Sequence, residues 1–274
     1  MNFFERILYA LSAKMPEPSH YGWFHLLFFA IVIGLTIFIC IKFKNTSEKT
    51  FRKIILIGWI VMFVFEIYKQ LILSVNFAED AATWSYKWYA FPYQLCSTPL
   101  YLLPFVAFLK EGKVRDAVVS FIATFALFGG IVTFIIPNDI FYPTIGLSIQ
   151  TMVHHGLQII LGIFCIVYYR KKWNFKLLLK GNIVFVIMTA IALTLDLSLK
   201  SLASKNFNMF YLSPYVNCPL PIFNVIYKNV PYIVFLLIYI IGFVLVSVLI
   251  HYISYAIIKA VEKKGAKKNL WKKR

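Results

Sequence analysis

Seven long apolar segments take up most of this chain and decide what it can fold into. A helix needs roughly 20 apolar residues to cross a hydrocarbon layer about 30 Å thick, and each segment reaches that length. Hydrophobic residues make up 61% of the sequence, well above the share of about 45–50% in soluble domains. The sequence therefore predicts an all-α, polytopic membrane bundle of seven transmembrane helices, with spans at 23–42, 54–75, 89–109, 117–136, 146–169, 177–199 and 231–258.

Little of the chain lies outside this membrane domain, which we place at residues 23–258. Residues 1–22 begin with apolar side chains at helical spacing, which is typical of an amphipathic segment lying on the membrane surface. Residues 259–274 form a basic tail. No internal repeat is visible, which disfavours the transporter folds built from inverted repeats.

Basic residues predict the orientation of the bundle. Lys and Arg are enriched in cytoplasmic loops close to the spans. The segments 42–53, 110–115, 170–180 and 259–274 hold 21 of them, and the alternate segments hold 6. The N terminus is therefore expected outside and the C terminus in the cytoplasm. The net charge of +17 is explained by this anchoring and by contacts of the tail with anionic headgroups, so nucleic-acid binding is not predicted.

Several polar groups lie inside the predicted spans, where each costs a few kcal/mol by insertion scales. When the spans are aligned in a bilayer, these groups fall in the outer half of the membrane, and we expect a polar chamber open to that side. The alternative is that they are contacts between helices, each worth under about 1 kcal/mol. The residues are His25, Glu66, Lys69, Gln70, Cys96, His154, His155 and Asp196.

The third predicted span contains Pro92, Pro99 and Pro104 around Cys96. Each proline lacks an N–H donor and crowds the carbonyl four residues earlier, so this helix should bend or break. Irregular backbone survives inside a membrane only where protein or a water-filled cavity satisfies its polar groups. Cys96 is therefore expected at a distorted, polar point of the bundle, although most cysteines in such helices are inert.

Two adjacent histidines, His154 and His155, interrupt the fifth span. Gln158 shares a helical face with His154. Counted from the outer boundary, Cys96 and His154 lie at the same depth, about 10–12 Å. Histidine is the usual base that activates a thiol as a nucleophile. Paired histidines also bind metals, with His25, Glu66 or Asp196 as further ligands, but no metal-binding spacing is present and we predict no metal.

The remaining polar groups have structural interpretations beside the functional ones. Glu66, Lys69 and Gln70 share a helical face and can form an internal ion pair, while Glu66 could instead orient a histidine. His25 follows interfacial aromatic residues and could be an interfacial residue itself. Asp196 lies one turn before Lys200 and could form a salt bridge with it.

The order of these signals resembles the YwaF-type family of bacterial integral membrane proteins, which is related to an animal membrane protein that acts as a lipid acyltransferase. The resemblance covers about residues 20–250. It rests on Phe24 and His25 at the start of the first span, PYQLC at 92–96, HHG at 154–156, NMFYL at 208–212 and VPY at 230–232.

Two positions depart from the family pattern. Gln94 stands where relatives carry a histidine, and Met209 stands where they carry a tyrosine. The missing histidine removes one candidate base from the cysteine element. In the animal relative the equivalent cysteine is implicated in acyl transfer to a lysophospholipid, so the resemblance implies such an activity here.

The resulting hypothesis is a lipid acyltransferase of the cell membrane that acts on phospholipid or lysophospholipid without a cofactor. Cys96 would be the nucleophile, and His154 or His155 the general base and acid. Asn208 or Gln94 would donate hydrogen bonds to the oxyanion. The alternative is a small-molecule carrier or sensor that uses the same chamber for binding alone. The sequence makes no prediction of oligomeric state.

Overall fold

The computed structural model describes residues 1–78, 81–138 and 140–271, with the side chains of the last helix described up to residue 264. Most of the described chain is helical, which confirms the all-α prediction. The α-helices are α1 (Phe3–Leu11), α2 (Trp23–Phe43), α3 (Glu48–Ser74), α4 (Pro99–Phe108), α5 (Lys113–Phe121), α6 (Leu127–Ile135), α7 (Ile145–Tyr169), α8 (Phe175–Ser198), α9 (Pro221–Asn229) and α10 (Tyr232–Trp271).

Short elements link these helices. A π-helical stretch, η3 (Ile122–Ala126), joins α5 to α6, so that the three form one continuous rod. An antiparallel hairpin pairs β1 (Val75–Phe77) with β2 (Ala82–Trp84) just after α3. The remaining 3₁₀ turns are η1 (Trp88–Ala90), η2 (Leu95–Ser97), η4 (Arg170–Lys172), η5 (Lys200–Lys205) and η6 (Met209–Tyr211).

Six helices among the described residues are long and apolar enough to cross a membrane. They correspond to six of the seven predicted spans. The predicted span 89–109 is different, because only its second part is a regular helix, α4, and the apolar helical stretch Leu95–Phe108 is shorter than a full span. The regular helix begins only at Pro99, as the prolines predicted, whereas α4 continues through Pro104. Multiple membrane helices are therefore shown, while the count of seven stays a prediction.

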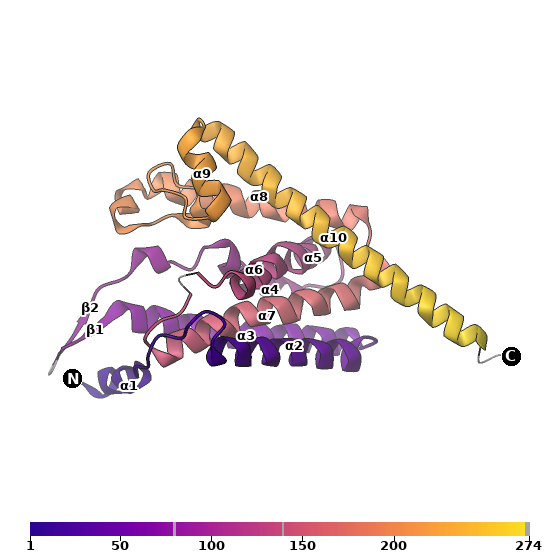
Figure 1. Ribbon diagram of the computed structural model, residues 1–274, viewed down its shortest axis with the longest axis horizontal. Coiled ribbons are helices and arrows are strands. Elements are labelled where there is room, and N and C mark those ends of the chain that lie inside the picture. The colour runs from indigo at the N-terminus through magenta and orange to yellow at the C-terminus, as the bar shows by residue number, and fades with distance from the viewer. Residues whose placement is uncertain (79–80, 139, 272–274) are drawn as a thin grey trace.

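Helix α7 lies at the centre of the packing (Figure 1). It contacts α2 and α3 on one side and α6 and η3 on the other, and α5 packs along α8. Helix α10 runs diagonally over α8, α9 and η3. Helix α1 and the far end of α10 lie at opposite ends of the bundle. Helices α2, α4 and α7 all end on one side of the bundle, which we call the basic end.

Arginine side chains close the helices that terminate at the basic end. Arg52 donates to the carbonyl oxygens of Ala107 and Phe108 at the end of α4, at 2.5 and 2.8 Å. Arg170 donates to the Lys44 carbonyl just after α2, at 2.6 Å. The last carbonyls of a helix have no partner within it, and a cation there also complements the helix dipole. These arginines therefore stabilise helix ends as well as carrying charge.

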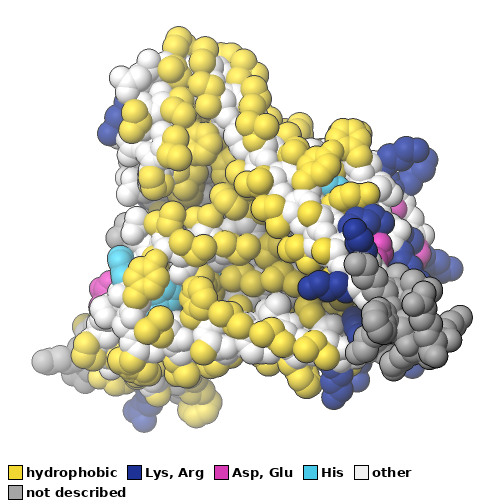
Figure 2. Space-filling model, turned by 45° about the vertical axis from the view of Figure 1, so that its right-hand side comes forward, with side chains coloured by type: hydrophobic (Ala, Val, Ile, Leu, Met, Phe, Trp, Pro, Cys, Tyr) yellow, Lys and Arg dark blue, Asp and Glu magenta, His cyan; other side chains and the backbone are white. Residues whose placement is uncertain are grey.

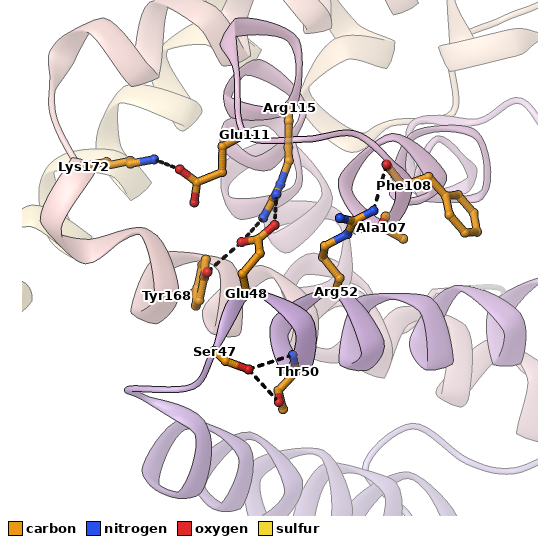
Figure 3. Close-up of polar contacts among 10 residues, drawn as sticks. All are labelled: Ser47, Glu48, Thr50, Arg52, Ala107, Phe108, Glu111, Arg115, Tyr168 and Lys172. Carbon is orange, nitrogen blue, oxygen red and sulfur yellow. Dashed lines mark hydrogen bonds and ion pairs between the residues drawn. The ribbon is translucent and has the colours of Figure 1, made fainter.

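An ion pair between a buried arginine and a partly exposed glutamate joins three helices at the same end (Figure 3). Arg115 of α5 is fully buried and donates through both terminal nitrogens to Glu48, the first residue of α3. Tyr168 of α7 donates to the same carboxylate at 2.8 Å, and the guanidinium lies 5.4 Å from the ring centre of Phe51. Ser47 caps α3 beside them. The pair and the Tyr168 hydroxyl thus join α3, α5 and α7.

The surface is that of a membrane protein. Figure 2 shows hydrophobic side chains over most of the visible face, with most of its Lys and Arg side chains gathered towards one edge. At the end opposite the basic end, α1 buries Leu8 against Ile72, Val75 and Leu147. Its other apolar side chains are exposed, including Phe3 at 81%. An exposed apolar face is what an interfacial helix presents to lipid.

Topology can be tested by thiol labelling in a variant whose four native cysteines are replaced by alanine. Ser85, after β2, and Lys113, at the start of α5, are both exposed and lie in predicted outer and cytoplasmic loops. A cysteine replacing Ser85 should react with a membrane-impermeant maleimide in intact cells. One replacing Lys113 should react only after permeabilisation. Labelling of the second site in intact cells would reverse the orientation.

The pair of Glu48 with Arg115 predicts that replacing two different glutamates will lower the free energy of unfolding by different amounts. Glu48→Gln leaves the Arg115 charge buried without its partner, which should cost about 3 kcal/mol. Glu111→Gln removes an ion pair with Lys172 whose side chains are 48% and 52% exposed, so it should cost less than about 1 kcal/mol. Thermal unfolding in one detergent compares the two variants. Equal losses would show that Arg115 does not depend on Glu48.

Candidate functional site

The candidate site forms where the chain is not regular helix, at residues 95–98 just before α4. The chain makes the short turn η2, and α4 begins only at Pro99, whose ring cannot donate to the Leu95 carbonyl. Thr98 donates to that carbonyl instead, through its hydroxyl at 2.6 Å. Local hydroxyl bonds of this kind replace the helical ladder around a proline.

The second carbonyl released by a proline is also satisfied. Pro104 cannot donate to the Leu100 carbonyl, and the indole of Trp59 on α3 donates to it at 2.8 Å. The proline spacing thus explains a contact between α3 and α4 that no periodicity would predict. The irregular stretch is held by its neighbours throughout.

The Cys96 carbonyl accepts hydrogen bonds from two side chains of α7. His154 Nε2 and Gln158 Nε2 each lie 2.9 Å from it. The two residues are one helical turn apart, so their side chains reach the same point. Both are buried, and Cys96 is half-buried. The sequence predicted that Cys96 and a histidine would approach through their side chains. The contact found joins the His154 imidazole to the Cys96 peptide carbonyl, and the approach of the thiol stays a prediction.

These contacts determine which nitrogen of each histidine is free. A carbonyl only accepts, so His154 Nε2 carries a proton and its neutral ring has the lone pair on Nδ1. His154 Nδ1 is buried and has no partner among the described residues. His155 has the opposite arrangement, because its Nδ1 donates to the Thr151 carbonyl at 2.9 Å. Each ring is thus anchored through one nitrogen and keeps a basic nitrogen on the other side.

Two glycines let α6 approach this point. A Cβ on Gly130 would lie 2.7 Å from the His155 carbonyl oxygen and 3.1 Å from Gln158 Cβ. A Cβ on Gly129 would lie 3.3 Å from Gln158 Oε1 and 3.9 Å from Cys96 Cβ. The π-helical stretch η3 directly precedes α6, and such stretches are frequent at functional sites. Close packing here brings α6 against Cys96.

Gln94 connects the cysteine segment to the loop after α8. Its Nε2 donates to the Asn208 carbonyl at 2.7 Å, and its Oε1 is buried without a partner in the described structure. Asn208 uses its own amide to brace the loop, accepting from Ser213 N at 2.9 Å and donating to the Asn217 carbonyl at 3.3 Å. Asp196 accepts from Met209 N at 2.7 Å. These three predicted site residues form one connected set.

The loop at 208–212 is strained. Phe210 and Tyr211 are consecutive residues with φ of 53° and 59°, in the left-handed region. Each such residue costs about 1–3 kcal/mol and persists only where the surroundings fix it. Here Tyr239 donates to the Phe210 carbonyl at 2.9 Å and Tyr232 to the Leu212 carbonyl at 2.6 Å, both from α10. The sequence did not predict this conformation, because aromatic residues rarely adopt positive φ angles.

An internal ion pair forms between Glu66 and Lys69, as the structural interpretation predicted, and Gln70 adds a hydrogen bond to it. Lys69 Nζ lies 2.8 Å from Glu66 Oε1, and Gln70 donates to the same oxygen at 2.6 Å. Gln70 also donates to the Ala90 carbonyl at 2.7 Å, which ties α3 to η1. Glu66 Oε2 is buried with no described partner. Among the residues that the structure describes, no hydrogen bond joins this set to the histidines.

His25 lies apart from these contacts. It is fully buried and accepts from Tyr21 N at 3.1 Å. The rings of Phe29, Phe134 and Phe141 surround it, with centroids 5.6 to 6.2 Å away. Among the described residues no hydrogen bond or ring contact connects it to Cys96 or His154. The Nε2 atom of His25 is buried inside this aromatic cage and has no hydrogen-bond partner in the described part of the chain.

Five of the predicted residues keep a buried acceptor without a partner in the described part of the chain. The atoms are Glu66 Oε2, Gln94 Oε1, His154 Nδ1, Gln158 Oε1 and Asp196 Oδ2. Buried polar atoms are normally hydrogen-bonded, so each unpaired one requires an explanation. Within the described residues no group of three His, Cys, Asp or Glu side chains is arranged to hold a metal ion.

A model of the TMEM164 family matches residues 16–255, which include every element of the site. The chain belongs to the TMEM164 family. The match supports a polytopic membrane protein and does not confirm the YwaF-type label that the motifs suggested. No curated protein and no solved structure matches the chain.

The packing of α6 in this TMEM164 family member predicts unequal effects of two glycine substitutions. Gly130→Ala places a methyl group against the backbone of α7 and should cost about 1–3 kcal/mol. Gly34→Ala on α2 meets nothing within 4 Å and should gain roughly 0.5–1 kcal/mol by restricting the unfolded chain. Thermal unfolding in detergent measures both effects. A neutral Gly130→Ala variant would contradict the close approach of α6.

Proposed function

We propose that this protein is a lipid acyltransferase of the cell membrane, in which Cys96 takes an acyl group from a phospholipid and passes it to a lysophospholipid. The observation that carries the proposal is the pair of α7 side chains on the Cys96 carbonyl, together with a buried, unpartnered nitrogen on the other side of the His154 ring. A purely structural role would explain the two hydrogen bonds. It would leave the unpartnered Nδ1 unexplained.

The first half-reaction forms a thioester. The imidazole of His154 or His155 takes the proton from the Cys96 thiol, and the thiolate attacks the ester carbonyl carbon. The tetrahedral intermediate collapses by breaking the bond between that carbon and the lipid oxygen. The imidazolium returns its proton to the departing oxygen, so the products are acyl-Cys96 and a lysolipid.

The second half-reaction is the reverse with a different acceptor. The hydroxyl of an incoming lysophospholipid loses its proton to the imidazole and attacks the thioester carbonyl. The carbon–sulfur bond breaks and the thiolate regains the proton. Water as the acceptor would make the protein a lipase, so exclusion of water from the site determines which activity results.

The unpartnered acceptors give the substrate its binding partners. Glu66, Gln94, Gln158 and Asp196 would accept hydrogen bonds from hydroxyl or amine groups of a lipid near the ester. Gln94 and Asn208 retain one N–H each with which to approach the oxyanion. His25 lies among aromatic rings and is assigned only a supporting role.

A hydrocarbon groove lies close to this point. It has a volume of about 320 Å³ and runs between α2, α6 and α7. Its lining includes Ile131 and Ile159, which directly follow Gly130 and Gln158 in the sequence. Thr36 also lines it, but its hydroxyl is already bonded to the Val32 carbonyl. An acyl chain fits such a surface without leaving a polar group unpaired.

The predicted orientation places the site in the outer half of the membrane. Acyl-CoA is absent outside the cell, so a phospholipid is the expected acyl donor. In this arrangement residues 1–22 lie on the outer surface, and the basic tail at 259–274 lies against anionic headgroups on the cytoplasmic side.

The second candidate is a carrier or sensor that binds a small molecule at the same residues. The unpartnered acceptors favour it equally, because a bound ligand would satisfy them without chemistry. It differs from the first candidate in requiring no reactive thiol. A variant without the Cys96 thiol therefore separates the two candidates.

Lipid profiling of membranes that contain the native protein, Cys96→Ala or Cys165→Ala at equal abundance tests the proposal. Cys165 is a fully buried cysteine on α7 and serves as the matched control. The native protein and Cys165→Ala should shift the acyl composition of phospholipids, and Cys96→Ala should not. A double variant, His154→Gln with His155→Gln, should slow turnover tenfold or more. Identical profiles for native protein and Cys96→Ala would end the enzyme proposal.

A further inference from the structure

Glycine at position 129 of α6 leaves a small space beside Cys96, which we call the Gly129 space. A Cβ added there would lie 3.3 Å from Gln158 Oε1 and 3.9 Å from Cys96 Cβ. Apart from its chain neighbours and the backbone of its own helix, no other atom of the described residues lies within 4 Å of that point. The Cys96 sulfur is bonded to the same Cβ, and both Cys96 and Gly129 are partly exposed. A small group beside Gly129 would therefore lie next to the residue that carries the thiol.

A buried acceptor of α7 borders the Gly129 space. Gln158 Nε2 donates to the Cys96 carbonyl at 2.9 Å, and since a carbonyl only accepts, this bond fixes the orientation of the amide. Gln158 Oε1 is left as an acceptor without a partner among the described residues, although the side chain is only 1% exposed. A buried acceptor without a partner costs free energy. The group that fits the Gly129 space is therefore a hydrogen-bond donor.

Of the two lipids in the proposed reaction, the lysophospholipid brings such a donor. In a diacylphospholipid the glycerol oxygens beside the ester carbonyls are all esterified and carry no hydrogen. A lysophospholipid keeps a free glycerol hydroxyl, which is also the group that must attack the acyl-Cys96 thioester. An oxygen in the Gly129 space needs only a small shift from the Cβ point to reach the usual O–H···O distance of about 2.5–3.0 Å from Gln158 Oε1. The unpaired acceptor thus favours the acyl acceptor over the acyl donor.

We propose that the Gly129 space is the binding position of the acceptor hydroxyl, where Gln158 Oε1 accepts its hydrogen bond and Gly129 determines specificity by leaving room for it. This inference rests on the proposed acyl transfer at Cys96. As the hydroxyl oxygen attacks the thioester carbon, the hydroxyl leaves Oε1 and gives its proton to the imidazole. The carbon–sulfur bond breaks, and the Cys96 thiolate takes the proton from the imidazolium. Any side chain at position 129 would occupy the place of the hydroxyl.

The test measures the two half-reactions separately in purified protein reconstituted into phosphatidylcholine vesicles, whose lipid brings no free hydroxyl. The acyl donor is p-nitrophenyl palmitate with a deuterated chain, and its burst of nitrophenol reports thioester formation at Cys96. The acceptor is lysophosphatidylcholine, and phosphatidylcholine that carries the deuterated chain reports transfer. Mass spectrometry of the protein before and after neutral hydroxylamine, which cleaves thioesters, measures acyl-Cys96.

Gly129→Ala should keep the acylation burst, because the donor ester does not use the Gly129 space. Transfer per acylated Cys96 should slow about 100-fold, as a misplacement of about 1 Å at a reacting group does. Acyl-Cys96 should therefore accumulate. The matched control is Gly242→Ala on α10, whose Cβ would also approach one side chain closely, at 3.1 Å from Phe223 Cζ. This control should match the native protein in both half-reactions.

Transfer is expressed per acylated Cys96, so misfolded protein does not enter the comparison. Gly129→Ser, which fills the same space, should repeat the slow transfer. A native transfer rate in Gly129→Ala, or a lost burst in a variant that unfolds at the native temperature, would overturn this inference and leave acyl transfer standing. An equal burst from native protein and Cys96→Ala would instead overturn the proposed function, and the inference with it.

Discussion

The site depends on one peptide carbonyl, that of Cys96, which α7 holds through His154 and Gln158. Without those two donors, the carbonyl would be left without a partner at a point where the neighbouring His154 and Gln158 side chains are buried, which costs free energy. Pro99 removes the helical ladder around it, so the surrounding helices must satisfy it. The glycines of α6 then allow a third helix to close on the same point. Both of these α7 side chains bind the backbone at Cys96, and neither binds its thiol.

Much of this arrangement followed from the sequence. The prolines predicted an irregular segment, and the depths of Cys96 and His154 predicted that the two residues lie at one level, where the histidine contacts the cysteine backbone. The pairing of Glu66 with Lys69 followed from helical spacing. Such predictions succeed because proline chemistry and helical geometry are local, or because a bilayer fixes depth.

Other features could not be read in this way. The count of seven full spans is not confirmed, because the segment at 89–109 forms a regular helix only from Pro99. The sequence did not separate His25 from the other polar groups, since depth says nothing about position around the bundle. Neither the left-handed pair at 210–211 nor the close approach of Gly130 has a local signal. Both are imposed by side chains that lie far away in the chain, on α7, α8 and α10.

The arginines at the basic end have a consequence for how this protein can evolve. Arg52 and Arg170 belong to the charge excess that predicts orientation, yet each also closes a helix end by donating to its last carbonyls. A lysine would preserve the orientation signal but not the planar, two-pronged geometry. Loops of membrane proteins usually drift freely in sequence so long as their net charge persists. At these two positions one side chain serves both the predicted orientation and the closure of a helix end.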